Sequence, residues 1–496
     1  MTTEKRTDMN ATPIIPGFHP DPSICRVGED FYLVNSTFEY LPGVPIFHSS
    51  NLVAWKQVSN VLDRADQLTL PSSAGGCGIY APTIRHHGGQ FWMITSNMNQ
   101  IRNGHLIVRA TDPSGPWSTP VFTSGAVGID PDLFWDADGT CYLTWAAGWG
   151  EYPIMQATVD PTTGKLLSAP YGLTQGSGLA HPEGPHLYHR GDWYYLLLAE
   201  GGTERGHAVT IARSHSVQGP FEWNPANPIL SHRSTTHPVQ NTGHADLVET
   251  AQGWAMVYLG VRPVGPSPSF HLNGRETFIA RVTWVDDWPV VDDDAFEISE
   301  TPSRFSDDFT SDELDGRWIA PGRHPRDFTA PAVGGGLAIQ PSDTAEYRSL
   351  LAIRVEDQAW EARATTECSG ARLVLRLDDA HWAAVESRGD QIIARAVVGP
   401  FDQEFAVMSI STDSSPTVTL AIRSTQPKAD LFGTVVSDNL HLGWMRDNEF
   451  RTLATIDGRY ISTEVAGGFT GRVIGVEPLP GQPGPAVLYE FSYKGL

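Results

Sequence analysis

Five short segments of the sequence place a polar or ionisable residue just before an apolar stretch. The segments are HPDPS (19–23), IYAPT (79–83), IDPDL (129–133), HPEGP (181–185) and GHADL (243–247), and they contribute Asp21, Tyr80, Asp130, Glu183 and His244. Three carboxyl groups in one pocket would suit glycoside hydrolysis, in which one carboxylic acid protonates the leaving oxygen and another carboxylate activates water or attacks the sugar. This chemistry requires a fold that brings the five segments together.

Two carboxyl groups with opposite tasks need different pKa values, and a third carboxylate near the proton donor raises the donor's pKa by like-charge repulsion. Glu183 suits the donor because its side chain is the longer one and Gly184 beside it leaves room for a leaving group. Asp21, held between two prolines, suits a base that positions one water molecule. Asp130 then suits the group that raises the pKa of Glu183. No cofactor is required for this chemistry.

Each of the five segments lies ten or eleven residues before an aromatic-rich predicted strand. These strands begin at Phe31, Phe91, Cys141, Trp193 and Trp254, so that successive copies are 50 to 61 residues apart. Every copy also has a shorter predicted strand before the aromatic one and another after it, with polar turns between them. Five such copies predict a five-bladed β-propeller, in which equivalent positions of the blades meet at one end of the central axis.

A different pattern begins after the acidic, proline-containing segment 290–304. Stretches of alternating apolar and polar residues, such as RLVLRLDD (372–379) and TVTLAIRS (417–424), recur there at short spacing, which is typical of an antiparallel sandwich. We therefore predict an all-β chain, with a five-bladed β-propeller catalytic domain over 12–303 and a C-terminal β-sandwich over 304–496. A carbohydrate-binding module or a purely stabilising one would show the same pattern in the second domain.

The composition restricts the partners of the chain. A net charge of −23 argues against nucleic acid and anionic membranes and is compatible with a neutral oligosaccharide substrate. The four cysteines lack the spacing of a disulfide framework or a zinc site. The N-terminal segment has no apolar signal-peptide core, and no stretch approaches 18 apolar residues. We expect a cytoplasmic protein without a membrane partner; a homo-oligomer is compatible with the sequence.

Several motifs carry a resemblance to a known family. They are GFHPDPSIC (17–25), IDPDLFWDADG (129–139), PEGPHLY (182–188), TGHADLV (242–248) and NGRETF (273–278). In this order they resemble glycoside hydrolase family 43, especially its β-xylosidases and α-L-arabinofuranosidases. The resemblance implies a five-bladed propeller that hydrolyses glycosides with inversion at the anomeric carbon.

The same resemblance assigns roles to single residues. It implies that Asp21 is the general base, Asp130 the pKa modulator and Glu183 the general acid. It also implies that Arg275 contacts the substrate and the carboxylates. His244 corresponds to a histidine that contributes to the substrate site and helps to hold a cation through water, so a structural calcium ion (Ca²⁺) on the propeller axis is compatible with the family.

Aromatic residues and two loops complete the predicted pocket. Phe38 and Tyr80 are candidates for a wall that stacks on the sugar ring, although Phe38 would fit the propeller core equally well. In the resembling family the position of Tyr80 is often tryptophan. The loop 261–277 positions Arg275, and the family's sandwich loop, here GGFTGRVIG (467–475), would narrow the pocket and favour removal of single sugars from chain ends.

These observations predict an inverting exo-glycosidase that releases xylose or arabinose from the ends of xylo- and arabino-oligosaccharides. Inversion requires a separation of about 6.5–9.5 Å between the carboxyl groups of Asp21 and Glu183, which leaves space for the attacking water. Two alternatives stay open at this point. One is a carbohydrate-binding propeller without catalysis, and the other is a retaining propeller glycosidase, in which the two carboxyl groups would lie closer together.

Overall fold

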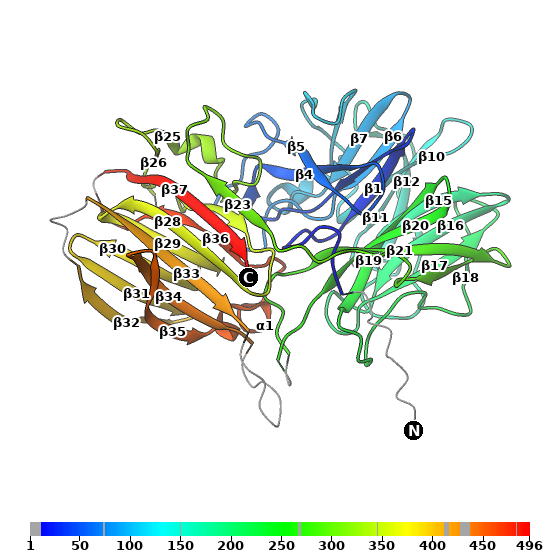
Figure 1. Ribbon diagram of the computed structural model, residues 1–496. Coiled ribbons are helices and arrows are strands. Elements are labelled where there is room, and N and C mark those ends of the chain that lie inside the picture. Colours follow the sequence, from blue (N-terminus) through cyan, green and yellow to red (C-terminus); the bar gives the residue numbers. More distant parts are fainter. Residues whose placement is uncertain are drawn as a thin grey trace, which may run out of the picture.

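The structure is a computed structural model, and it describes residues 11–72, 75–148, 150–265, 269–344, 346–410, 416–426, 437–482 and 484–496. Within these ranges the chain is almost entirely β-structure, arranged as a ring of five sheets followed by two packed sheets (Figure 1). The predicted fold class, a five-bladed propeller followed by an antiparallel sandwich, is confirmed. No helix in the described ranges is long and apolar enough to cross a membrane.

The five blades are consecutive antiparallel sheets. Blade 1 contains β1 (Ser23–Val27), β2 (Asp30–Val34), β4 (Gly43–Ser49) and β5 (Lys56–Leu62); blade 2 contains β6 (Thr83–His87), β7 (Gln90–Thr95), the 3-10 helix η1 (Met98–Asn103), β8 (Leu106–Ala110) and β9 (Val121–Phe122). Blade 3 contains β10 (Ile129–Trp135), β11 (Cys141–Ala146), β12 (Ile154–Asp160), β13 (Lys165–Leu166) and β14 (Tyr171–Thr174). Blade 4 contains β15 (Glu183–Arg190), β16 (Trp193–Glu200), β17 (Ala208–Ser214) and β18 (Glu222–Trp223), and blade 5 contains β19 (Gln240–Thr250), β20 (Gly253–Val261), β21 (Glu276–Val285) and β22 (Trp288–Asp292).

Apolar contacts between neighbouring blades close the ring. Separate hydrophobic clusters join blades 1 and 2, 2 and 3, 3 and 4, 4 and 5, and finally 5 and 1. The second strand of each blade is aromatic-rich and apolar because it packs between two neighbouring blades. The N-terminal segment strengthens the closure, since the Ile14 N–H donates to the Thr277 carbonyl on β21 at 2.9 Å.

The C-terminal domain consists of two antiparallel sheets. The larger contains β23 (Arg304–Asp307), β25 (Thr329–Pro331), β26 (Leu337–Ile339), β28 (Trp360–Glu367), β33 (Thr417–Thr425), β34 (Asn439–Arg446), β35 (Glu449–Asp457) and β37 (Ala486–Gly495). The smaller contains β27 (Leu351–Arg354), β29 (Ser369–Asp378), β30 (His381–Arg388), β31 (Gln391–Val398), β32 (Phe401–Ser409) and β36 (Val473–Pro478), and the short helices are η2 (Pro325–Asp327), η3 (Gly458–Ile461) and α1 (Thr463–Ala466). The predicted boundary between 303 and 304 stays a prediction; β22 ends at Asp292 and β23 begins at Arg304.

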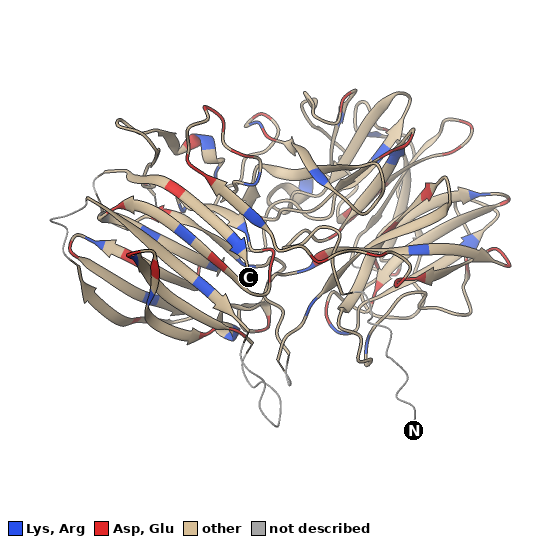
Figure 2. Cartoon of the chain, in the orientation of Figure 1, with Lys and Arg blue, Asp and Glu red and all other residues tan. Residues whose placement is uncertain are grey.

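The sandwich is fixed against blade 1, close to the segments predicted to carry chemistry. The short strands β3 (Tyr40–Leu41) and β24 (Ala320–Pro321) pair across the two domains. Arg376 of β29 is fully buried and lies 3.5 Å from the carboxylate of Glu39, and Arg354 donates to the Phe18 carbonyl at 3.0 Å. Acidic and basic residues are interspersed over both domains (Figure 2). Because neither domain presents charge of a single sign, the contact between the propeller and the sandwich depends on particular buried pairs such as Arg376 and Glu39.

Candidate active site

The structure brings the three predicted carboxyl groups together, from blades 1, 3 and 4. Asp21 and Asp130 are buried, with 5% and 7% of their surface exposed, and Glu183 is partly exposed. Burial raises the pKa of Asp130, and the negative charges of Glu183 and Asp21 raise it further, so the three groups lie within electrostatic reach of one another. Arg275 joins them from the end of the loop before β21, where its Nη1 donates to Asp21 Oδ1 at 2.9 Å.

Left-handed backbone at the entry to the inner strands positions these side chains. Asp21, Asp130 and His244 have φ values of 52°, 53° and 47°, a conformation that non-glycine residues seldom adopt outside constrained sites. The pairing register shifts beside the last two, on β10 and β19, which marks irregularities of the kind that redirect a side chain. The Asp21 side chain is then held by Arg275 and by the Ser36 hydroxyl, which donates to its other oxygen.

Blade 4 differs from this pattern by one residue. The left-handed residue there is Gly184, with a φ of 55°, and Glu183 precedes it. A Cβ atom at Gly184 would lie 3.2 Å from the ring of His244, a tight contact that glycine avoids. His244 thus occupies the side of Gly184 on which a Cβ atom would lie, and the space for a leaving group beside this glycine stays a prediction. Glu183 therefore lies one residue before the left-handed position, whereas Asp21 and Asp130 occupy that position themselves.

The surroundings of Asp21 favour its ionised form. Burial alone would raise its pKa, but the positive charge of Arg275, together with His244 and the hydrogen bond from Ser36, brings the pKa below its ordinary value. His244 Nδ1 lies 3.8 Å from Asp21 Oδ1. Burial lowers the pKa of His244 to about 4, so this imidazole is neutral at physiological pH. Asp21 is consequently an anion that can accept a proton.

Glu183 and Asp130 are shifted in the opposite direction. Loss of hydration and the negative charge of Asp21 raise the pKa of Glu183 to about 7, although Arg275 opposes the shift. Burial and the charge of Glu183 raise the pKa of Asp130 well above its ordinary value, while the Gly184 N–H donates to its Oδ2 at 3.1 Å and stabilises the anion. Because the two carboxyl groups repel each other when both are ionised, the pair retains one proton at a pH where isolated carboxyl groups would have lost both.

Aromatic rings from both domains surround Arg275. Phe38 is only 2% exposed, and the ring of Phe469 stacks on it with centroids 5.7 Å apart. Tyr80 meets both rings edge-on at 5.2 and 5.8 Å. The guanidinium carbon of Arg275 lies 5.6 Å from the centroids of Phe38 and Phe469, and its Nη2 donates to the Phe469 carbonyl at 3.3 Å. Phe38 is therefore largely covered, and the more exposed aromatic surface belongs to Tyr80 and Phe469.

Two glycines allow the Arg275 loop to pack directly on the sandwich. A Cβ atom at Gly274 would lie 2.8 Å from the Cα of Gly471, and one at Gly471 would lie 2.2 Å from the Asn273 carbonyl oxygen. Neither position therefore accommodates a larger residue without backbone movement. This close approach brings Phe469, two residues before Gly471, against Arg275. Of the loop 261–277 expected to position Arg275, residues 266–268 lie outside the described ranges.

A cavity of about 1270 Å³ opens beside Arg275. It is lined by loops of blades 4 and 5 and by sandwich residues that include Phe469 and Glu464. Glu464 of α1 accepts from His271 Nδ1 at 2.6 Å, which ties the sandwich to the propeller on this wall. The three acids are not among its lining residues; Arg275, which contacts both the cavity and Asp21, connects the two regions.

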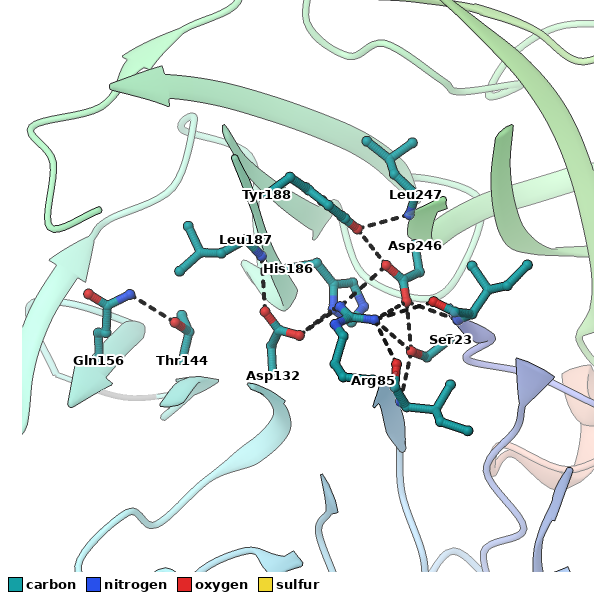
Figure 3. Close-up of polar contacts among 12 residues, drawn as sticks. Ser23, Arg85, Asp132, Thr144, Gln156, His186, Leu187, Tyr188, Asp246 and Leu247 are labelled. Carbon is teal, nitrogen blue, oxygen red and sulfur yellow. Dashed lines mark hydrogen bonds and ion pairs between the residues drawn. The ribbon is translucent and has the colours of Figure 1, made fainter. Parts of the chain in front are cut away.

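A second polar cluster lies where the inner strands of the blades meet, and three of its members, Ser23, Asp132 and Asp246, stand two residues after Asp21, Asp130 and His244 (Figure 3). Arg85 of blade 2 donates to Asp132 Oδ1 and to Asp246 Oδ2, both at 2.7 Å, and its Nη2 lies 2.9 Å from His186 Nδ1. Ser23 of blade 1 donates to Asp246 Oδ2 at 2.6 Å. All five blades thus contribute to this axial network, which contains Ser23, Arg85, Asp132, His186 and Asp246, together with Tyr188, whose hydroxyl donates to Asp246 Oδ1.

Sequence reasoning missed this network and one further contact. Asp132 lies outside the repeat positions that hold Asp21, Asp130, Glu183 and His244, yet it is fully buried on the axis. Its position two residues after Asp130, matched by Asp246 after His244, was the signal that could have found it. Thr203, whose hydroxyl accepts from Arg275 at 3.0 Å, carries no such signal because it belongs to a loop outside the repeat.

Comparisons with known proteins agree with this arrangement. The family model for glycosyl hydrolases family 43 matches residues 10–289, and that for the beta xylosidase C-terminal Concanavalin A-like domain matches residues 306–494. The chain is 36% identical over 508 residues to a xylosidase/arabinosidase of Butyrivibrio fibrisolvens, covering 94% of each protein. It is 45% identical over 287 residues to a non-reducing end alpha-L-arabinofuranosidase of Bacteroides ovatus, covering 57% of this chain and 53% of that one.

A solved structure shows the same two-domain arrangement. The xylan beta-1,4-xylosidase of Bacillus halodurans superposes with a TM-score of 0.85 at 30% identity, over 97% of this chain and 99% of that one. The first family model spans more than half of the chain, and the Butyrivibrio protein matches it almost from end to end. The chain therefore belongs to glycosyl hydrolase family 43 and is a glycoside hydrolase.

Proposed function

We propose that this enzyme is an inverting exo-glycosidase that releases single xylose or arabinose residues from the ends of xylo- and arabino-oligosaccharides. The opposite pKa shifts of Asp21 and Glu183 within one site carry the proposal, because they leave a base and an acid together near neutral pH. The names of the similar proteins, a xylosidase/arabinosidase and a non-reducing end alpha-L-arabinofuranosidase, support both pentoses and an exo mode of action.

In the proposed reaction Glu183 donates its proton to the glycosidic oxygen as the bond to the anomeric carbon breaks. Asp21 accepts a proton from a water molecule that attacks the opposite face of the same carbon, which inverts its configuration. Asp130 keeps Glu183 protonated through like-charge repulsion. Afterwards Glu183 is ionised and Asp21 protonated, and exchange with solvent restores both. The separation of about 6.5–9.5 Å between the two carboxyl groups stays a prediction of this mechanism.

Arg275 and the aromatic wall are proposed to hold the terminal sugar. Among the described residues, Arg275 Nε is a buried donor without a hydrogen-bond partner, so it is suited to a sugar hydroxyl. Tyr80 and Phe469 supply apolar surface for the sugar ring; the stacking role predicted for Phe38 is weakened by its burial. The sandwich loop that carries Phe469 limits the depth of the site, which favours a chain end over the middle of a polymer.

Calcium has no part in the proposed steps. Ca²⁺ prefers six to eight oxygen ligands, whereas His244 offers a nitrogen, and Arg85 already pairs with the axial carboxylates of Asp132 and Asp246. The described residues around His244 therefore do not form a direct calcium site, and a cation there would depend on water ligands.

A cytoplasmic location and a homo-oligomeric state are also part of the proposal. Cell fractionation tests the location, and light scattering tests the oligomeric state.

Replacement of the proposed acid tests the function. We expect Glu183→Gln to lower kcat on xylobiose by about 10²–10⁴-fold, because glutamine cannot protonate the leaving oxygen. The loss on a nitrophenyl xyloside should be smaller, since this leaving group needs less protonation. Glu222→Gln, at an exposed glutamate of β18, is the matched control and should leave both rates unchanged. Hydrolysis of xylobiose by Glu183→Gln at the wild-type rate would remove Glu183 as the acid.

A further inference from the structure

Away from the three acids, the described residues contain one group of three ligand-type side chains that are close enough to hold a metal ion. The group consists of His232, His237 and Asp293, whose ligand atoms all lie within 4.8 Å of one another. His232 and His237 belong to the segment between β18 and β19, and Asp293 follows β22 directly. Two separate parts of the chain therefore meet at this point.

The two imidazole rings direct their Nε2 atoms toward Asp293. His232 Nδ1 lies 2.8 Å from the Val239 carbonyl oxygen, and an Nδ1–H that donates to this carbonyl leaves the Nε2 lone pair available for a metal. His237 Nδ1 accepts from the Val239 N–H at 3.1 Å and lies 3.1 Å from the Val239 carbonyl oxygen, so metal binding at its Nε2 requires the tautomer in which Nδ1 donates to that oxygen. The Nε2 atoms of His232 and His237 lie 2.7 and 3.9 Å from the same oxygen, Asp293 Oδ2.

A proton alone does not satisfy all three groups. A hydrogen bond can join His232 Nε2 and Asp293 Oδ2, which are 2.7 Å apart, but the 3.9 Å between His237 Nε2 and Asp293 Oδ2 is too long for one. A cation placed among the three ligand atoms, which all lie within 4.8 Å of one another, would contact each of them.

We propose that His232 Nε2, His237 Nε2 and the Asp293 carboxylate bind one divalent transition-metal ion. Two imidazoles and one carboxylate match Zn²⁺ in softness and number, whereas Ca²⁺ and Mg²⁺ prefer oxygen ligands alone. The Asp293 side chain is 25% exposed, which gives the ion a path from solvent and leaves room for a water ligand. No atom of the proposed hydrolytic site takes part.

The ion would fix one wall of the cavity. Ser234, Thr235, Thr236 and His237 line this cavity, and Asp293 belongs to the end of blade 5. The segment is already folded for binding, since the Thr235 hydroxyl donates to the His232 carbonyl at 2.6 Å and Gln240 Nε2 donates to the His237 carbonyl at 2.8 Å. Metal binding would therefore join this wall to blade 5 without rearrangement of the loop.

Titration of chelator-treated full-length protein with ZnCl₂ at pH 7.5, followed by calorimetry, tests the proposal. We expect one equivalent to bind, with at least tenfold weaker binding in His237→Ala and in Asp293→Asn. Co²⁺ should produce visible absorption bands in the wild type that both variants lack. His215→Ala is the matched control, because its Nδ1 also contacts a backbone carbonyl but His215 belongs to no group of three ligand-type side chains in the described structure. Zn²⁺ should raise the Tm of the wild type and of this control only.

The pH dependence and the location of the ion provide independent checks. Zn²⁺ affinity should fall below pH 6, because both imidazoles must be neutral to bind. Circular dichroism of each metal-free variant shows whether it is folded before titration. Absence of saturable binding by the wild type, or wild-type affinity in both His237→Ala and Asp293→Asn, would overturn the proposal. Loss of the ion in Glu183→Gln with retention in His237→Ala would place it at the acids instead and would also overturn it.

Discussion

Asp21 and Glu183 are carboxyl groups of the same site, yet their surroundings shift their pKa values in opposite directions. Asp21 receives hydrogen bonds from Arg275 and Ser36, which stabilise its anion. Among the described residues, no cation donates a hydrogen bond to Glu183, and burial together with the negative charge of Asp21 raises its pKa. The assignment of base and acid thus follows from the placement of one arginine, because that arginine pairs directly with Asp21.

The pH dependence of hydrolysis should reflect this difference. Glu183 must be protonated to act, and its pKa is about 7, so kcat/KM should fall tenfold per pH unit above that value. Asp21 must be ionised, and because its pKa is lowered, the acid limb should lie below the ordinary range for aspartate.

Asp130→Asn should move the alkaline limb of this pH profile to lower pH, since it removes a like charge that raises the pKa of Glu183. We expect Asp138→Asn, at an exposed turn, to leave the limb unchanged; an unmoved limb in Asp130→Asn would contradict the proposed modulation.

At the level of residues, the sequence predicted the groups that repeat and missed those that do not. Asp21, Asp130, Glu183 and His244 were found because the propeller repeat places them before successive inner strands. Phe469 was not singled out, since the sandwich has no such repeat. The one-residue difference at Gly184 could not be predicted, because the close approach of Gly184 to His244 joins two blades that are far apart in the sequence.

At the level of elements, the inner strands of the blades are joined by the axial network. Asp132 and Asp246 are completely buried, and their charges are balanced by the single guanidinium of Arg85. Asp132 lies two residues after Asp130 on β10, and Ser23, which is part of the same network, lies two residues after Asp21. The network therefore fixes the strands that carry the proposed base and modulator.

Removal of the central cation should weaken the fold. We expect Arg85→Gln to lower the free energy of unfolding by about 3–5 kcal/mol, because two buried carboxylates lose their partner. Arg26→Gln is the control; it breaks an exposed pair with Glu29 and should change the value by less than about 1 kcal/mol. Urea denaturation followed by tryptophan fluorescence measures both. An equal, small effect in the two variants would show that the axial pairs contribute little.

The elements themselves were largely predictable, because each blade repeats the same order of turn and aromatic strand. The strands beginning near Phe31, Phe91, Cys141, Trp193 and Trp254 are all present as the second strands of the blades. The axial network was not predicted as a unit. Arg85 lies outside the repeat position that Tyr80 occupies, and only the closed ring shows that it faces residues from four other blades.

At the level of the whole molecule, the sandwich completes the site of the propeller. The propeller supplies the acids and Arg275, while the sandwich supplies Phe469 and the glycine-to-glycine contact that holds the Arg275 loop. Buried pairs such as Arg376 with Glu39 fix the two domains beside this loop. The sequence indicated both domains and a loop over the pocket, but the contacts between them depend on residues far apart in the chain and were not predictable.

Loss of the sandwich aromatic should affect turnover more than stability. We expect Phe469→Ala to lower kcat/KM on xylobiose by about 10–100-fold, because Arg275 loses one of its two rings and is held less firmly. Thermal denaturation should be nearly unchanged, since Phe469 is only partly buried. Phe405→Ala, at an exposed phenylalanine of β32, should alter neither quantity. Wild-type kcat/KM in Phe469→Ala would show that the sandwich loop does not shape the site.

The anomer released first from a β-xyloside tests the central claim most directly. If Asp21 activates water while Glu183 protonates the leaving oxygen, proton NMR of a fresh reaction on a nitrophenyl β-xyloside, whose leaving group is not a sugar, should show α-xylose before mutarotation produces the β-anomer. Initial release of β-xylose would mean that a carboxylate attacks the sugar itself, and it would contradict the assignment of Asp21 as a base.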